Sequence, residues 1–403
     1  MKNETILNEI ISEGQVNEVA SLNLAEIISH LLANLNPREQ DVLRRRYGLA
    51  GSEKETLESI GRAHKLTRER IRQIENVSVN KIKKNQSSEK LLSKLQKTVG
   101  DLLSEHGGVI DKAYLFKILH QLAKLQNVNS ESAEYYNHLS FLTSRIINDN
   151  LEELNDQELF NDLLKLKEQG IEHLAEVATE ALNKISEAKL MVATDDLIDL
   201  ILKSSAYQKH ADKFQAPGNL DFSNQMKEAL PDYSDKVWGN RVVYGLIKSI
   251  KKLDQNKFGN WGHTAWREVL PKTVNDKIYL VLKNHGKPMY YGDIAKRITE
   301  LGFDAKNVNT ATTHNELILD DKYVLVGRGM YGLKEWGYQD GTVADVVEAV
   351  LKAAARPMAK DELTEAVMKQ RLVKQTTVNL ALMNKNRFAK NSEGKYIKKI
   401  KKS

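Results

Sequence analysis

Two short amphipathic helical patterns, separated by only three residues, limit the folds that the first part of this chain can adopt. One helical pattern runs from Thr56 to Ala63, and Thr67 caps a second pattern that continues to about Lys84. The connection between them, His64-Lys65-Leu66, is long enough for a tight turn only. This spacing predicts a helix-turn-helix, preceded by a helix that starts at Asn36-Pro37 and ends at Gly48.

The second helix of this pair has two different faces. Apolar residues recur on one side, and polar residues occupy the opposite arc: Arg68, Glu69, Arg72, Gln73 and Asn76. Arg offers paired donors to guanine, Glu accepts from the cytosine amino group, and Gln pairs with an adenine edge. Arg68, Glu69 and Gln73 share the first turns, where a helix-turn-helix reaches base edges, so we predict that they read DNA bases.

Basic residues around this helix predict contacts with DNA phosphates. Residues 35–90 hold 14 Lys/Arg against 8 Asp/Glu, whereas residues 141–200 hold 5 against 14. The first segment would attract phosphates and the second would repel them, although solvated helix faces also explain the acidic segment. We predict phosphate contacts for five residues: Thr67, Arg70, Arg72, Lys65 and Lys81.

Composition excludes several kinds of chemistry. The chain of 403 residues has no cysteine, which removes disulfides, thiolate zinc sites and cysteine nucleophiles, and its ten histidines lack metal-ligand spacing. We therefore expect no metal and no cofactor. No apolar run approaches the ~20 residues that span a bilayer, and Met1-Lys2-Asn3-Glu4 lacks a signal-peptide pattern. We expect no membrane contact and a cytoplasmic, nucleoid-associated protein.

Residues 35–84 resemble region 4 of the sigma-70 family, the bacterial RNA polymerase specificity factors. The matching stretches are Leu35-Asn36-Pro37-Arg38-Glu39-Gln40 with Arg46-Tyr47-Gly48-Leu49, then Thr56-Leu57-Glu58-Ser59-Ile60-Gly61, then Thr67-Arg68-Glu69-Arg70-Ile71-Arg72-Gln73-Ile74-Glu75. The resemblance implies that Arg68, Glu69 and Gln73 read a promoter −35-type element.

Two features depart from the pattern of that family. Val77 and Asn80 stand where the family commonly has Lys and Arg, which should weaken phosphate contact. Region 4 closes the chain in sigma factors but opens it here, and no domain that could melt a −10 element is recognisable downstream. We therefore expect that the protein is not a complete sigma factor.

The last 130 residues contain an internal repeat. Lys287-Pro288-Met289 returns 69 positions later as Arg356-Pro357-Met358, and Val308-Asn309 returns 70 positions later as Val378-Asn379. Each copy has a pattern of helices followed by two strands around a glycine-containing turn. This pattern predicts two winged helices, and their wings would bring three basic residues to DNA: Arg328, Lys390 and Lys395.

Residues 275–336 resemble a HARE-type winged helix, the domain class shared by the delta subunit of some bacterial RNA polymerases. The matching residues are Tyr279-Leu280-Val281-Leu282-Lys283, Lys287-Pro288-Met289, Asp293-Ile294-Ala295 and the strand pair at 323–333. Members of this class bind DNA in some cases and polymerase in others, so the resemblance leaves the target open.

These observations predict a mainly α, multidomain fold with small β-hairpin wings. We expect an N-terminal helical segment at residues 1–34 and a sigma-70 region 4-like helix-turn-helix at residues 35–86. A helical middle follows at residues 90–265, with further small helix-turn-helix-like modules as an open alternative. A HARE-type winged helix at residues 272–336 and a second, divergent winged helix with a basic tail at residues 341–400 complete the chain.

Three kinds of function could use this organisation. The first is a sequence-specific regulator of transcription that binds double-stranded promoter DNA. The alternative is a delta-like accessory subunit that binds bacterial RNA polymerase and modulates sigma, which the acidic segment at residues 141–200 fits better. A nuclease or other enzyme would need a catalytic core in residues 90–270, where no catalytic motif stands, so we expect no enzymatic activity.

Overall fold

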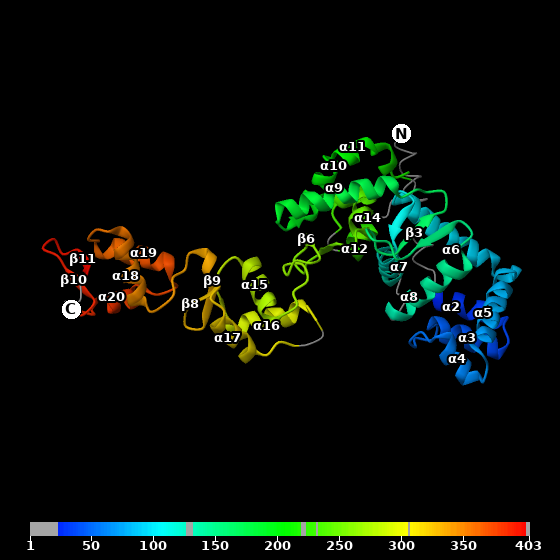
Figure 1. Ribbon diagram of the computed structural model, residues 1–403, viewed down its shortest axis with the longest axis horizontal. Coiled ribbons are helices and arrows are strands. Elements are labelled where there is room, and N and C mark those ends of the chain that lie inside the picture. Colours follow the sequence, from blue (N-terminus) through cyan, green and yellow to red (C-terminus); the bar gives the residue numbers. More distant parts are fainter. Residues whose placement is uncertain (1–22, 126–131, 219–222, 231–232, 305–306, 400–403) are drawn as a thin grey trace. The chain divides into compact units, whose positions relative to one another are not determined.

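The computed structural model describes residues 23–125, 132–218, 223–230, 233–304 and 307–399, and in these it is mainly helical (Figure 1). The chain divides into two compact units, residues 1–255 with 259–264 and residues 256–258 with 265–403. Residues 1–22 of the helical segment expected at residues 1–34 lie outside the described residues.

The described part of the first unit begins with four helices, and the last three start and end within two residues of the predicted positions. They are α2 (Leu24–Ala33), α3 (Pro37–Tyr47), α4 (Leu57–His64) and α5 (Arg68–Lys83). Asn36 and Glu39 form a capping box at the start of α3, and Gly48 ends that helix in the left-handed conformation. Val42, Ile60 and Ile71 are fully buried where α3, α4 and α5 meet, so these three helices share one small core.

Residues 86–166, called the first module, follow directly. They comprise α6 (Gln86–Glu105), β1 (Val109–Asp111), α7 (Lys112–Leu125), α8 (Ser132–Phe141), a π-helical turn η1 (Leu142–Ile146), β2 (Leu151–Leu154) and β3 (Leu163–Leu166). The strands form an antiparallel sheet in the order β1-β3-β2. The predicted helical middle at residues 90–265 did not include this sheet.

Residues 172–263, called the second module, repeat the scheme with extra short helices. They comprise α9 (Glu172–Ala188), β4 (Val192–Ala193), α10 (Thr194–Leu202), α11 (Ser205–Lys209), η2 (Ala211–Phe214), α12 (Ser223–Ala229), α13 (Asp235–Gly239), α14 (Arg241–Ser249), β5 (Leu253–Gln255) and β6 (Asn260–His263). The sheet order is β4-β6-β5, so the first strand again pairs with the last.

The second unit contains two further modules. The third module comprises α15 (Val274–His285), β7 (Met289–Tyr290), α16 (Tyr291–Leu301), α17 (Thr310–Leu319), β8 (Tyr323–Gly327), β9 (Met330–Leu333) and η3 (Lys334–Trp336). The fourth comprises α18 (Val343–Ala354), α19 (Lys360–Gln370), α20 (Gln375–Leu382), β10 (Phe388–Lys390) and β11 (Tyr396–Lys398). A bridge from Met358 to Tyr396 stands where the other modules have their first strand.

The internal repeat is visible in these two modules, with one correction. Helices α15 and α18, and likewise α16 and α19, begin 69 residues apart, as the sequence predicts. The predicted match of Val308-Asn309 with Val378-Asn379 is wrong, because the first pair precedes α17 and the second lies within α20. These two helices begin 65 residues apart, so the loop before α20 is shorter by four residues.

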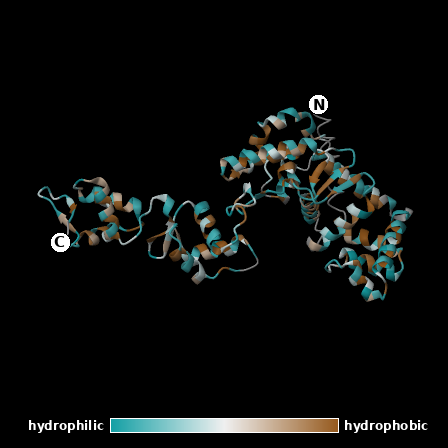
Figure 2. Cartoon of the chain, in the orientation of Figure 1, coloured by the Kyte–Doolittle hydropathy of each residue, from teal (hydrophilic) through white to brown (hydrophobic). Residues whose placement is uncertain are grey.

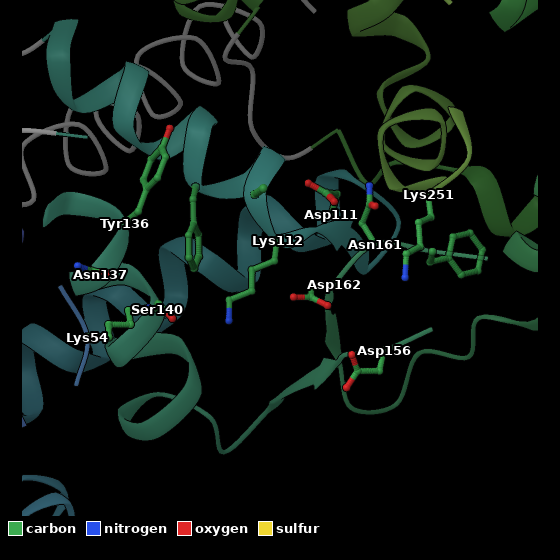
Figure 3. Close-up of a pocket in the computed structure, with 13 residues that line it drawn as sticks. Lys54, Asp111, Lys112, Tyr136, Asn137, Ser140, Asp156, Asn161, Asp162 and Lys251 are labelled. Atoms are coloured by element: carbon green, nitrogen blue, oxygen red, sulfur yellow. The ribbon is translucent and has the colours of Figure 1, made fainter. Parts of the chain in front are cut away.

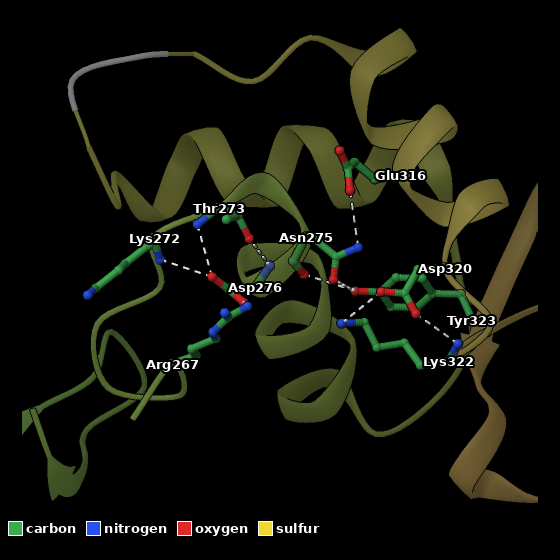
Figure 4. A network of polar contacts seen from close by, with 9 residues as sticks. All are labelled: Arg267, Lys272, Thr273, Asn275, Asp276, Glu316, Asp320, Lys322 and Tyr323. Atoms are coloured by element: carbon green, nitrogen blue, oxygen red, sulfur yellow. Dashed lines mark hydrogen bonds and ion pairs between the residues drawn. The ribbon is translucent and has the colours of Figure 1, made fainter. Parts of the chain in front are cut away.

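A polar network fixes the start of α15 in the third module (Figure 4). The Asp276 carboxylate accepts hydrogen bonds from the backbone N–H groups of Lys272 and Thr273, at 3.1 and 3.0 Å. The Tyr323 hydroxyl donates to the Asn275 carbonyl oxygen at 2.9 Å, which ties strand β8 to the first turn of α15. The network therefore holds the hairpin against the first helix of the module.

The helices carry both hydrophilic and hydrophobic residues along their length (Figure 2). Within the described residues, no helix combines the length and the apolar character needed to cross a membrane.

Candidate nucleic-acid interface

A tight turn sets the angle between α4 and α5. Lys65 ends α4 in the left-handed conformation, with a φ of 54°, and the Leu66 N–H donates to the Gly61 carbonyl oxygen at 2.9 Å. A Cβ atom at Gly61 would lie 2.7 Å from the Leu66 carbonyl oxygen, which is closer than real Cβ contacts allow. Glycine at position 61 thus permits the close approach that the turn requires.

The outer face of α5 carries the residues predicted to touch DNA. Ile71 is fully buried on the opposite face, whereas five side chains are exposed: Arg68, Glu69, Arg70, Arg72 and Gln73. This arrangement leaves a polar helix surface open to solvent above an apolar seam.

Predicted base-reading and phosphate-binding residues are paired on this face. Arg72 donates to both carboxylate oxygens of Glu69, at 2.8 and 2.7 Å, and Arg70 Nη1 donates to Gln73 Oε1 at 3.1 Å. The hydrogen bond from Arg72 lowers the pKa of Glu69 below its usual value. Glu69 is therefore an ionised acceptor, suited to a donor such as the cytosine amino group.

Arg68 lies at the edge of a hollow beside the start of α4. The hollow has a volume of about 360 Å³ and is lined by Arg46, Thr56, Leu57, Glu58 and Arg68. Thr67 precedes Arg68 as the N-cap of α5, where its hydroxyl accepts from the Arg70 N–H at 3.2 Å. The N-termini of both helices open near these cations, which is the usual setting for a phosphate oxygen.

The other predicted phosphate ligands lie in different surroundings. Lys65 is exposed in the turn, whereas Lys81 Nζ is 2.6 Å from the carboxylate of the buried Glu39 on α3. Lys81 therefore joins α5 to α3 in addition to any role at DNA. The roles assigned to these residues remain predictions.

The predicted wing residues all belong to the second unit. Arg328 is exposed in the turn between β8 and β9. Lys390 Nζ lies 5.1 Å from the centre of the Tyr396 ring, and Lys395 forms an ion pair with Glu393 at 2.9 Å. Their contacts with DNA also remain predictions.

The first module packs against the α2–α5 helices, which the sequence did not indicate. Helix α8 lies on α2 and α3, where His138 Nε2 is 3.1 Å from the Leu49 carbonyl oxygen and Asn137 donates to the Gly48 carbonyl oxygen at 3.2 Å. Arg145 Nη2 reaches α5 itself and donates to Asn76 Oδ1 at 2.9 Å. Asn76 and Arg145 lie in different elements far apart along the chain, and helical or strand periodicity carries no information about such a contact.

A cleft of about 670 Å³ lies beside this contact (Figure 3). Its charged lining residues are Lys54, Lys112 and Lys251 together with Asp111, Asp156 and Asp162. Burial and the nearby Lys112 and Arg46 lower the pKa of Lys54, whereas Lys112 is paired with Glu153 at 2.7 Å. The balanced charges give this cleft no clear preference for an anion. Across the described residues, no group of three or more His, Asp or Glu side chains is arranged to hold a metal.

Comparison with known proteins identifies the α3–α5 helices. The family model "Sigma-70, region 4" matches residues 31–84. The chain is 47% identical over 75 residues to RNA polymerase sigma factor SigA1 of Synechococcus elongatus, covering 19% of each chain. It is 42% identical over 71 residues to sigma factor RpoD of Neisseria gonorrhoeae, covering 18% of this chain and 11% of the relative.

These matches define one domain and leave the rest of the chain unmatched. The chain spans about a fifth or less of the length of these curated relatives. No solved structure matches it. Residues 31–84 are therefore a sigma-70 region 4 domain, similar to region 4 of bacterial sigma factors.

Proposed function

We propose that the protein is a sequence-specific regulator of transcription that recognises a −35-type promoter element through α5 and is not a complete sigma factor. One observation carries the proposal: Arg68, Glu69 and Gln73 are exposed together on α5, within a sigma-70 region 4 domain. Double-stranded DNA is the proposed partner, and the role is one of binding rather than catalysis, with no metal or cofactor.

The four modules are, in this proposal, winged helices. Among the described residues, the first and third modules share the order helix, strand, helix, helix and hairpin, with the first strand beside the last. The second module keeps this order and strand pairing but has extra short helices before α14, and the fourth replaces the first strand by a bridge. This order supports the HARE-type assignment for the third module and extends the winged-helix interpretation to residues 86–263. The hairpins would carry Arg328, Lys390 and Lys395 toward DNA phosphates.

A specific observation favours the alternative, an RNA polymerase-associated accessory subunit. Helices α17 and α20 contain no Lys or Arg, and each exposes large apolar side chains: Ile318 (60%), Leu319 (80%) and Leu380 (69%). Such faces suit a protein partner better than a DNA groove, because phosphate contact needs positive charge. Polymerase is the partner that this alternative names.

Binding to two duplexes tests the proposal. The full chain is titrated by fluorescence anisotropy against a duplex with a −35-type hexamer and against a scrambled duplex at one physiological salt concentration. We expect tighter binding to the first duplex, and we expect the double change Arg68→Ala, Glu69→Ala to abolish the preference, since each good base contact contributes about 1–3 kcal/mol of discrimination. Equal binding of both duplexes by the unchanged chain would reject the −35 assignment and favour the polymerase alternative.

A further inference from the structure

The segment that follows α8 runs along the second half of α5. Arg145, in the turn η1, donates from Nη2 to Asn76 Oδ1 at 2.9 Å. Two turns farther along α5, Lys83 Nζ donates to Asn148 Oδ1 at 2.6 Å and lies 3.6 Å from Asp149. The first module therefore borders the helix that carries the base-reading residues.

Arg145 fixes the orientation of the Asn76 side chain. A guanidinium group can only donate hydrogen bonds, so the oxygen of the Asn76 amide must face it and the NH₂ group must face away. Asn76 is partly exposed. Its amide thus presents two donors beside the outer face of α5, where an unpaired asparagine could present either end.

The position of Asn76 favours a phosphate rather than a base as its target. Asn76 stands eight residues after Arg68, which is about 12 Å along the helix axis. A recognition helix touches base edges with its first turns, and its later turns approach the DNA backbone. The neighbouring outward positions Val77 and Asn80 carry no charge. The cation that contacts Asn76 is Arg145.

Arg145 contacts a buried carboxylate on one side and retains hydrogen-bond donors for a ligand on the other. Its Nη2 lies 3.9 Å from Glu75, a buried carboxylate that also accepts a hydrogen bond from the Tyr47 hydroxyl. The Arg145 side chain is still 35% exposed. Among the described residues, its Nε and Nη1 atoms have no hydrogen-bond partner. The guanidinium is thus anchored on one side and open on the other.

We propose that Arg145 and Asn76 together bind one backbone phosphate of the DNA duplex, so that the first module contributes directly to the interface of the region 4 domain. This inference rests on the proposed function, because it places the duplex against α5. The contact is charge-assisted and independent of sequence: it adds affinity and fixes the register of the helix, while Arg68, Glu69 and Gln73 provide discrimination.

Salt dependence of binding by the full chain tests this contact. Each phosphate neutralised by a cation contributes about 0.9 to the slope of log K against log salt concentration on duplex DNA. We expect Arg145→Ala and Arg145→Gln to lower that slope by about 0.9 and to weaken binding to the −35-type and scrambled duplexes equally. Arg145→Lys should preserve the slope. Asn76→Ala should weaken binding to both duplexes without changing the slope.

Lys184→Ala supplies the matched control. Lys184 is 39% exposed, close to the exposure of Arg145, and it is also ion-paired, to Glu180 at 2.8 Å on α9. Its removal should leave affinity and slope unchanged. Circular dichroism and thermal unfolding confirm that each variant is folded, and Arg145→Gln, which retains a donor toward Asn76, serves if Arg145→Ala does not fold.

The two readouts separate this inference from the proposed function. Sequence preference is the ratio of the two affinities, whereas the phosphate contact is measured by the slope on either duplex. An unchanged slope for Arg145→Gln, or an unchanged affinity for Asn76→Ala, overturns the inference even if the −35 preference holds. A lowered slope without sequence preference retains the phosphate contact and rejects the −35 assignment instead.

Discussion

His106 is a buried titratable group whose protonation should change the stability of the first unit. The side chain follows α6, its Nδ1 lies 2.8 Å from the Leu102 carbonyl oxygen, and its ring lies 6.1 Å from that of Tyr114. Among the described residues, its Nε2 has no hydrogen-bond partner. Burial, aided by the nearby Arg241, lowers the pKa of His106 from 6.5 to about 4. The folded chain therefore keeps a neutral imidazole.

This pKa shift predicts a loss of stability in mild acid. As the pH falls below 6.5, the unfolded chain binds a proton at His106 and the folded chain does not, so stability declines until the folded pKa near 4 is reached. The loss amounts to about 3 kcal/mol across that window. Urea unfolding between pH 7 and pH 4 should therefore show a smaller decline for His106→Asn, whose amide can still donate to Leu102. Equal declines in the two proteins would contradict this role.

At the residue scale, the sequence could predict features that depend on near neighbours along the chain, but not contacts between residues far apart in it. The exposure of Arg68, Glu69 and Gln73 follows from helical periodicity, because Ile71 must face the core. Arg145 contributes through a contact with a residue 69 positions earlier, and local patterns contain no such information.

At the scale of elements, the turn between α4 and α5 has the strictest steric requirement. We expect Gly61→Ala to destabilise the protein by about 1–3 kcal/mol, because the added Cβ meets a backbone oxygen and overpacking has costs of this size. Binding to the −35-type duplex should weaken as well, since the turn sets the angle of α5. Urea unfolding and the anisotropy titration measure the two effects.

Gly100→Ala is the matched control for this change. Gly100 lies inside α6, its φ is not positive, and a Cβ there would meet nothing within 4 Å. Alanine should therefore stabilise the helix by about 0.5–1 kcal/mol. If Gly61→Ala and Gly100→Ala were equally stable, the steric account of the turn would be wrong.

Element length explains which parts of the fold the sequence could predict. Helices α3, α4 and α5 carry caps and at least two turns of periodic apolar residues, and the β8–β9 hairpin is marked by Gly327 and Gly329. Strands β1 and β4 have only three and two residues, so an alternating pattern cannot be recognised in them. Their pairing depends on strands more than fifty residues away.

At the scale of the whole molecule, the region 4 domain packs against the first module. Phe141 of α8 is fully buried and its ring centre lies 4.7 Å from that of Tyr47 on α3. Helix α14 of the second module is likewise buried and packs on β1 of the first. In these two modules the helix before the hairpin serves internal packing, whereas α17 and α20 expose large apolar residues.

The second unit should add affinity without adding discrimination. We expect the combined change Arg328→Ala, Lys390→Ala, Lys395→Ala to weaken binding to both duplexes equally. The salt slope should fall by as much as about 2.7 if each cation contacts one phosphate. Anisotropy titrations across a salt series measure both quantities. An unchanged slope would show that these residues do not meet DNA, and it would favour a protein partner for the second unit.

An unbiased selection of duplexes by the full chain tests the central claim most directly. The chain is offered a library with a randomised central segment, and the bound duplexes are sequenced after several rounds, beside those bound by Arg68→Ala. We expect one −35-type motif for the unchanged chain, and we expect that motif to become degenerate at one or two positions for Arg68→Ala, because that side chain reads base edges in this account. Selection of no motif, or of a motif that Arg68→Ala leaves intact, would contradict recognition of promoter DNA through α5.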